Sequence, residues 1–291
     1  MEDTKGTGEK EQWELAWQDC LRWAAEKDAG FAKRCEEFGI IPENIALSEL
    51  ERLPVQRSAL GKNAFSRLTL PLSGISRILG KTTYLAEELA VWERCAEQWL
   101  RSCGVTRATV LLIADGFSED GPGWGMLRGA NALKTTVCTV AERPWEIVAE
   151  YGVTACALTK PLLEQWVSRG GSAGSCQAFF CLSNDLSAEE RQCWQERLNV
   201  PIYRQIGLAG VQASAIAWEC SRQQGYHWPL ESFWPELIAG GELVVTALQR
   251  RSTTVIRLQT GIKGEFLTGL CPCGATWPRF LPSENRRLGK R

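Results

Sequence analysis

The chain has 291 residues, of which 44% are hydrophobic and 23% charged, and its formal net charge is −1. This composition is typical of a globular protein with one large domain or two modest ones, long enough to bury a sizeable core. The near-zero charge excludes a global field that would attract nucleic acid or an anionic membrane, so neither is expected as a partner.

The sequence contains no run of the roughly 20 apolar residues that a membrane span requires. Its first residues are polar and acidic, without the apolar core of a signal peptide. We therefore expect a cytoplasmic protein, in which the twelve cysteines are mostly free thiols. Those in apolar runs (Cys138, Cys156 and Cys181) are expected to act as small core residues.

The first third of the chain predicts helices. The apolar spacing predicts a helix over 11–38 ending before Gly39, a short helix over 47–53 stopped by Pro54, and a helix over 85–103. Tryptophans at helical spacing (Trp13 with Trp17, Trp92 with Trp99) are expected to pack in the core. Paired glutamates on these and later helices are expected to be solvated rather than acid–base pairs: Glu36-Glu37, Glu87-Glu88 and Glu189-Glu190.

Strand-like and helical segments then alternate. Strands are expected over 108–114, 135–140, 153–158, 178–182 and 201–206, and helices over 124–133, 145–151, 161–169 and 188–198. Alternation of this kind predicts an α/β protein with a mainly parallel sheet. After Trp218 the sequence pattern predicts mainly strands. A strand pair is expected over 242–248 and 253–260, joined by a turn at 249–252. These changes suggest three segments: a helical and irregular one (1–84), an α/β core (85–218) and a β-rich region (219–291).

The strongest candidate site combines three cysteines with the single histidine. In a Pro/Gly loop, Cys271 and Cys273 are separated by a single residue. Cys220 and His227 flank a turn at Gly225. A Cys₃His set fills the tetrahedral coordination of a structural zinc ion and leaves no open position for catalysis. A bare C-x-C is a weak signal, so the spacing alone also allows unrelated thiols and a surface histidine.

Two glycine-rich stretches resemble anion-binding loops. Gly74–Thr82 is similar to the P-loop motif that binds phosphate. However, five residues separate its glycines where four are required, and no apolar strand precedes it. Gly121–Gly125 lies at a predicted helix start, where backbone amides could meet an anion. A tight turn is the simpler interpretation of the second stretch.

Seven segments, read in chain order, form a further pattern: Leu50-Glu51-Arg52-Leu53-Pro54, Pro201–Leu208, Trp218-Glu219-Cys220, Gly225-Tyr226-His227, Phe233-Trp234-Pro235-Glu236, Glu242–Thr246 and Val255–Gly261. Their order and spacing resemble the phenylacetate–coenzyme A ligase family of adenylate-forming enzymes. The resemblance implies an adenylate-forming-enzyme-like N-terminal core with a mainly parallel sheet and a small zinc-stapled β region. It also implies that Cys220, His227, Cys271 and Cys273 bind structural zinc, as in members with a C-x-C-G loop. The family continues beyond the position of Arg291 into a small domain with a catalytic lysine, so this C-terminal domain is expected to be absent.

The same resemblance implies that the nucleotide site is vestigial. The family's adenine-stacking tyrosine falls at Ile206, beside Gly207, and its Thr-Glu pair, in which the glutamate serves magnesium, falls at Ala209-Gly210. The ribose-binding aspartate falls at Ile262, and Ser73–Thr83 lacks the family's Ser/Thr/Gly phosphate loop. Aliphatic residues and glycine cannot make these bonds through side chains, so binding of ATP and magnesium is not expected.

These observations favour a non-catalytic interaction or regulatory protein with a protein partner. Trp228 and Trp277, close to the zinc loop in sequence, are expected on the exposed face that such a partner would cover. The alternative is an AMP-forming acyl- or aryl-coenzyme A ligase with an altered nucleotide site, or one that needs a separate C-terminal domain. A small-molecule or coenzyme A binder is the third possibility.

Overall fold

The computed structural model describes residues 7–56, 84–114, 117, 121–140, 143–170, 172–208 and 211–283. The chain divides into two compact units, each built from two stretches of sequence. The first unit comprises Met1–Val91 and Pro229–Gly264, and the second comprises Trp92–Trp228 and Glu265–Arg291. The division into segments 1–84, 85–218 and 219–291 stays a prediction. Over the described part of the chain, no helix combines the length and apolarity needed to cross a membrane.

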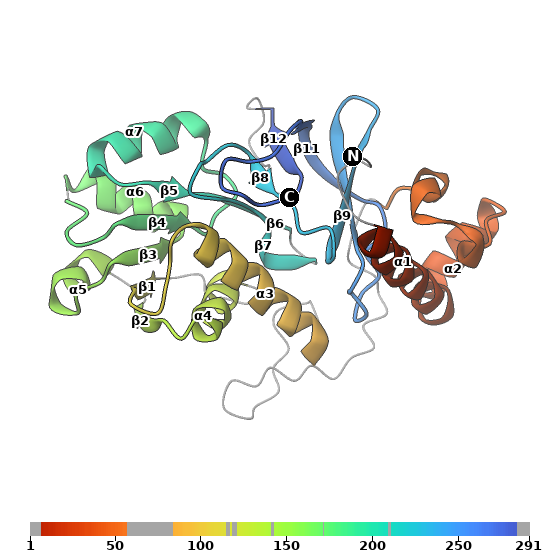
Figure 1. Ribbon diagram of the computed structural model, residues 1–291, viewed down its shortest axis with the longest axis horizontal. Coiled ribbons are helices and arrows are strands. Elements are labelled where there is room, and N and C mark those ends of the chain that lie inside the picture. The colour runs from red at the N-terminus through yellow and green to blue at the C-terminus, as the bar shows by residue number, and fades with distance from the viewer. Residues whose placement is uncertain are drawn as a thin grey trace. The chain divides into compact units, whose positions relative to one another are not determined.

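The second unit contains a five-stranded parallel sheet with the order β2-β1-β3-β4-β5, which confirms the predicted α/β class (Figure 1). The strands are β1 (Val110–Ala114), β2 (Thr136–Val140), β3 (Ala155–Leu158), β4 (Ala178–Cys181) and β5 (Ile202–Tyr203). The helices are α3 (Ala86–Ser102, of which Trp92 onward belongs to this unit), α4 (Gly123–Ala132), α5 (Pro144–Glu150), α6 (Lys160–Ser168) and α7 (Ala188–Leu198).

Alternate residues of these strands enter two different hydrophobic layers. On one face, Cys156 and Phe179 pack in a cluster that includes Trp166 of α6. On the other face, Phe180 meets Trp99 of α3 edge-on, with ring centroids 5.3 Å apart. Burial of both faces explains why β1, β3 and β4 are continuous apolar runs.

The cysteines and tryptophans expected in the core lie largely there. Side chains at Trp17, Trp92 and Trp99 are at most 1% exposed, whereas Trp13 is partly buried. Cys156 and Cys181 are fully buried. Cys138 is only half-buried, because its strand β2 lies at the edge of the sheet.

Two glycines of α4 allow close packing of that helix. A Cβ atom on Gly125 would lie 2.2 Å from Ser214 Oγ, and one on Gly129 would lie 2.6 Å from the backbone nitrogen of Glu97. Gly125 ends the glycine-rich stretch at 121–125. The structure therefore gives that glycine a packing role at the helix start, beside strand β7.

The second unit also contains antiparallel strands in the order β6-β7-β8-β12. They are β6 (Gln205–Leu208), β7 (Gln212–Glu219), β8 (Tyr226–His227) and β12 (Arg279–Pro282). The single strand expected over 201–206 is wrong, because it is interrupted at Arg204. The Arg204 backbone N–H donates to the Glu219 carboxylate at 2.9 Å instead of continuing the parallel ladder.

The first unit opens with two helices rather than the single one expected over 11–38. Helix α1 (Thr7–Lys27) ends before Asp28, whose carboxylate accepts N–H bonds from Gly30 and Phe31 and caps α2 (Ala29–Glu37). An aspartate at this position starts a new helix because it satisfies amides that have no partner inside the helix. Two 3₁₀ helices follow, η1 (Pro42–Asn44) and η2 (Leu47–Arg52).

Strands β9 (Phe233–Ile238), β10 (Glu242–Ala247) and β11 (Leu258–Leu267) form antiparallel pairs; β11 lies in the first unit as far as Gly264. The second strand expected over 253–260 is therefore displaced, and the expected turn at 249–252 is part of a longer connection. Residues 250–252 in this connection bind Glu88 instead of forming a hairpin turn.

Glu88 corrects the expectation that the Glu87-Glu88 pair is solvated. Its side chain is 3% exposed and forms an ion pair with Arg250 Nη1 at 2.9 Å. It also accepts bonds from the backbone N–H groups of Leu85, Arg251 and Ser252 and from the Ser252 hydroxyl. A buried carboxylate must be compensated in this way, which amino-acid spacing alone does not reveal.

Candidate metal centre

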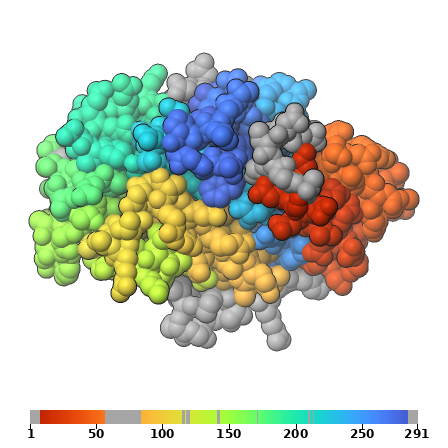
Figure 2. Space-filling view, in the orientation of Figure 1, coloured from red at the N-terminus to blue at the C-terminus, as the bar shows by residue number. Residues whose placement is uncertain are grey.

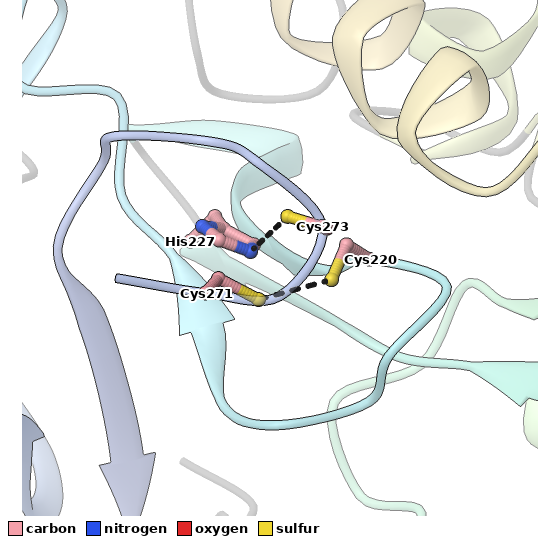
Figure 3. Close-up of side chains that lie close together, drawn as sticks. All are labelled: Cys220, His227, Cys271 and Cys273. Carbon is pink, nitrogen blue, oxygen red and sulfur yellow. Dashed lines mark hydrogen bonds between the residues drawn. The ribbon is translucent and has the colours of Figure 1, made fainter. Parts of the chain in front are cut away.

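Four side chains of the second unit converge on one point (Figure 3). Cys220 directly follows β7, His227 ends β8, and Cys271 and Cys273 lie in the loop between β11 and β12. Their candidate ligand atoms all lie within 4.8 Å of one another. The structure thus brings together the complete Cys₃His set that the sequence singled out.

Tight turns with left-handed residues aim these side chains inward. After Cys220, Gln223 and Gly225 have φ angles of 53° and 85°, which reverses the chain before His227. In the second loop, the Gly274 N–H donates to the Cys271 carbonyl at 3.0 Å, and Gly274 has a φ of 88°. Glycine adopts this conformation without the steric cost that other residues incur.

Two of the distances between the ligand atoms are those expected around a tetrahedral ion. Two zinc–sulfur bonds of about 2.3 Å at the tetrahedral angle place their sulfurs about 3.8 Å apart, and a sulfur–nitrogen pair lies at about 3.5 Å. Cys220 Sγ and Cys271 Sγ are 3.7 Å apart, and Cys273 Sγ lies 3.4 Å from His227 Nε2. Figure 3 shows both pairs of atoms pointing toward each other.

Backbone amides complete the sulfur environment. The Arg222 N–H donates to Cys220 Sγ and the Ala275 N–H donates to Cys273 Sγ, each at 3.4 Å. In both cases the donor lies two residues after the cysteine. Such bonds favour the thiolate, the form of cysteine that binds metal.

Burial controls protonation at the centre. It lowers the pKa of His227 to about 4, so the imidazole is neutral and can donate a nitrogen lone pair to a metal. Burial raises the pKa of the Cys220 thiol to about 12, so a cation must displace its proton. Burial also opposes ionisation of Cys271, but hydrogen bonds from Cys273 and Cys220 outweigh it and lower the pKa of Cys271.

The tryptophans near the centre correct one expectation. Trp228 is fully buried, with its ring edge-on to Phe280 at 6.4 Å, and so is not part of an exposed face. Trp277 is partly exposed and lies 6.4 Å from the His227 ring. Leu270, next to ligand Cys271, is 71% exposed. The blue segment that carries Cys271 and Cys273 lies at the surface in Figure 2.

Sequence reasoning assigned no role to two charged residues close to the ligands. Glu219, immediately before Cys220, is 1% exposed and forms ion pairs with Arg191 at 2.7 Å and Arg204 at 2.9 Å. Arg279 is 7% exposed and bonds to backbone carbonyls of both ligand-bearing loops. Glu219 belongs to the Trp218-Glu219-Cys220 stretch that carries the resemblance, but nothing in that stretch indicated its ion pairs, and no spacing pointed to Arg279.

The nucleotide positions contain no comparable polar cluster among the described residues. Ile206 of β6 is 3% exposed in the second unit, and Ile262 of β11 is 6% exposed in the first. Both backbone groups of Gly207 bond to the Asn184 side chain, at 2.9 and 2.6 Å. Ala209, Gly210 and the loops Ser73–Thr83 and Gly74–Thr82 lie outside the described residues.

The fold is that of adenylate-forming coenzyme A ligases. A structure of 2-hydroxyisobutyryl-CoA ligase in the postadenylation state has a TM-score of 0.80 at 17% identity, covering 95% of this chain and 67% of that one. An open conformation of this ligase, in complex with 2-HIB-AMP and CoA, has a TM-score of 0.79, also at 17% identity, with 92% and 67% of the two chains covered. No family model matches the sequence.

A curated protein extends this likeness to the sequence. The chain is 24% identical over 293 aligned positions to the phenylacetate-coenzyme A ligase of Thermus thermophilus, covering 88% of this chain. The predicted resemblance to phenylacetate–coenzyme A ligases is thereby confirmed. The match spans 65% of the length of that relative.

Proposed function

We propose that this adenylate-forming-ligase-like protein does not adenylate an acid and acts as a non-catalytic interaction or regulatory protein. The observation that carries the proposal is the pair of buried isoleucines, Ile206 and Ile262, at the expected adenine and ribose positions. A buried aliphatic side chain offers neither an aromatic face for adenine nor an acceptor for ribose hydroxyls.

The bonding of Gly207 supports the same proposal. Its N–H and C=O groups are both engaged by Asn184, so neither is free for a nucleotide in this conformation. At Ala209 and Gly210 the side chains contain no oxygen that could coordinate magnesium. Each missing interaction removes roughly 1–3 kcal/mol, and together they weaken binding of ATP to a dissociation constant above about 1 mM.

Isothermal titration calorimetry with ATP and magnesium tests this proposal. We expect no saturable heat below about 1 mM ATP. A variant with Ile206→Tyr, Ala209→Thr, Gly210→Glu and Ile262→Asp is the matched control, because it restores the side chains that the resemblance expects. Micromolar affinity in the unchanged protein would overturn the proposal.

The second candidate is an AMP-forming acyl- or aryl-coenzyme A ligase with an altered nucleotide site or a separately supplied C-terminal domain. The sequence likeness to a phenylacetate-coenzyme A ligase over 88% of the chain favours it. Acid-dependent exchange of pyrophosphate into ATP distinguishes the two candidates. Exchange by the purified chain, or after addition of co-purifying proteins, supports the ligase.

We also propose that the four-residue cluster binds structural zinc. Three thiolates with one imidazole favour zinc over magnesium or calcium, and the arrangement leaves no site for a catalytic water. Metal analysis of protein purified without chelator should give close to one zinc per chain. Iron in excess over zinc would contradict this assignment.

A protein partner in the cytoplasm is part of the proposal. Leu270 is exposed and Trp277 is partly exposed beside the candidate metal centre, and aromatic residues are frequent energetic anchors of interfaces. A pull-down at native concentration should recover one specific partner, and Trp277→Ala should reduce its recovery. Equal recovery of the partner by the unchanged chain and by Trp277→Ala would exclude Trp277 from the contact.

A further inference from the structure

Arg279 is a buried cation beside the candidate metal cluster that has no carboxylate partner in the described part of the chain. Its side chain is 7% exposed, and no ion pair among the described residues involves it. Other buried arginines of the chain are paired: Arg250 with Glu88, and Arg257 with Glu236. A buried guanidinium without a counter-charge is costly, so an anionic group near Arg279 is required.

The guanidinium bonds both loops that supply the ligands. Arg279 Nη1 donates to the Gln224 carbonyl at 3.2 Å, and Gln224 lies between Cys220 and His227. Arg279 Nη2 donates to the Gly269 carbonyl at 3.2 Å, two residues before Cys271. One side chain therefore links the first ligand loop to the second.

The backbone of Arg279 places it against a ligand as well. Arg279 pairs directly with His227 in the antiparallel β12–β8 ladder. The turn above it has no spare room, since a Cβ atom on Gly225 would lie 3.5 Å from the Arg279 Cβ and 3.1 Å from the Phe280 carbonyl oxygen. The arginine is thus fixed in place on the strand that supports the histidine.

The counter-charge that Arg279 requires matches the charge of a loaded Cys₃His centre. Three thiolates, a neutral imidazole and a divalent cation carry one net negative charge. We propose that Arg279 is the positioning residue of this centre: it holds the two ligand loops together and balances the charge of the metal–thiolate group. The inference rests on the proposed zinc site and deepens it.

Zinc affinity measured by competition with a chromophoric chelator tests the role of Arg279. Arg279→Met removes both the charge and the hydrogen bonds, and is expected to weaken zinc binding about 10- to 100-fold, as loss of outer-shell partners does in other metal sites. Arg279→Lys keeps the charge but not the fork that spans two carbonyls, so its affinity should lie between Met and Arg.

A matched control separates positioning from general destabilisation. Arg128 lies in the same unit on α4, a helix that supplies no ligand, and pairs with Glu93 of α3 at 3.2 Å. Arg128→Met should leave zinc affinity within about twofold of the unchanged chain. Cobalt(II) absorption gives a second readout: the d–d bands of the four-ligand site should shift in Arg279→Met and remain unchanged in Arg128→Met.

The outcomes are distinct. Unchanged zinc affinity and cobalt spectrum in folded Arg279→Met, or equal losses in Arg279→Met and Arg128→Met, would overturn the proposal. If Arg279→Met does not fold, the test rests on Arg279→Lys alone. A zinc affinity of Arg279→Lys equal to that of the unchanged chain would then overturn the proposal. Absence of stoichiometric zinc in the unchanged chain would refute the metal assignment itself, independently of Arg279.

Discussion

The candidate metal centre and the expected nucleotide positions come from the same resemblance, but the side chains found at them differ. At the metal centre every ligand expected from the resemblance is present, and the four side chains converge. Where the resemblance leads us to expect an adenine-stacking tyrosine and a ribose-binding aspartate, the chain has Ile206 and Ile262, both buried. The four side chains of the candidate metal centre are all present, whereas neither of these two described positions has the polar or aromatic side chain expected for a nucleotide.

The first unit also contains a polar residue of a matching stretch whose partners lie within the chain. Arg257, in the stretch that resembles the family's V-I-R element, donates to the backbone carbonyls of Glu51 and Leu53 and pairs with Glu236 at 3.2 Å. These partners lie in two further matching stretches. The resemblance therefore rests partly on polar residues that hold segments of the unit together.

Loss of a metal ligand should have the largest effect. Because metal binding contributes to folding free energy, Cys273→Ser is expected to lower the free energy of unfolding by about 4 kcal/mol and to abolish stoichiometric zinc. Cys138→Ser is the control, since Cys138 is a half-buried thiol of the edge strand β2. Chemical denaturation and metal analysis measure both variants. Full zinc and full stability in Cys273→Ser would show that the four ligands are wrongly assigned.

Neutralising the buried carboxylate of the first unit should come next. Glu88→Gln leaves Arg250 buried without its counter-charge, and breaking a buried ion pair in this way costs about 3 kcal/mol. The exposed neighbour Glu87 provides a matched control: Glu87→Gln should change the free energy of unfolding by less than about 0.5 kcal/mol. Similar losses of unfolding free energy in Glu88→Gln and Glu87→Gln would show that the buried ion pair with Arg250 is not the cause.

A smaller loss of unfolding free energy is expected when the side-chain bonds to the Gly207 backbone are removed. Asn184→Ala removes the two bonds from this side chain to the Gly207 backbone, which should cost about 1–2 kcal/mol in urea denaturation. Asp185→Ala, at the adjacent exposed position, should be close to neutral. If Asn184→Ala also creates ATP binding, Asn184 blocks a nucleotide site rather than stabilising a vestigial one.

The smallest effect is expected from ATP itself. With a dissociation constant of about 1 mM or weaker, about 2 mM ATP with magnesium stabilises the protein by at most about 0.6 kcal/mol. A dissociation constant of about 10 μM would give about 3 kcal/mol instead. Thermal denaturation resolves this difference, and the larger shift would contradict the proposed loss of nucleotide binding.

The sequence predicted elements best where a local pattern matched the final environment. The apolar run at 108–114 contains strand β1, which is buried from Leu111 onward, and the C-x-C loop does meet Cys220 and His227. Errors arose where a single polar residue overrides periodicity: Asp28 starts a new helix, and Glu219 interrupts the strand at Arg204. The burial of Glu88 depends on residues more than 160 positions away, which no local pattern contains.

The ion pairs of Glu219 tie the metal centre to the parallel sheet. The residue next to ligand Cys220 is bonded to Arg191 of α7 and to Arg204 at the end of β5. Backbone amides of α7 and β5 should therefore exchange with solvent in one cooperative opening event that also frees Cys220. Chelation of the metal would then speed amide exchange in α7, a helix that contributes no ligand.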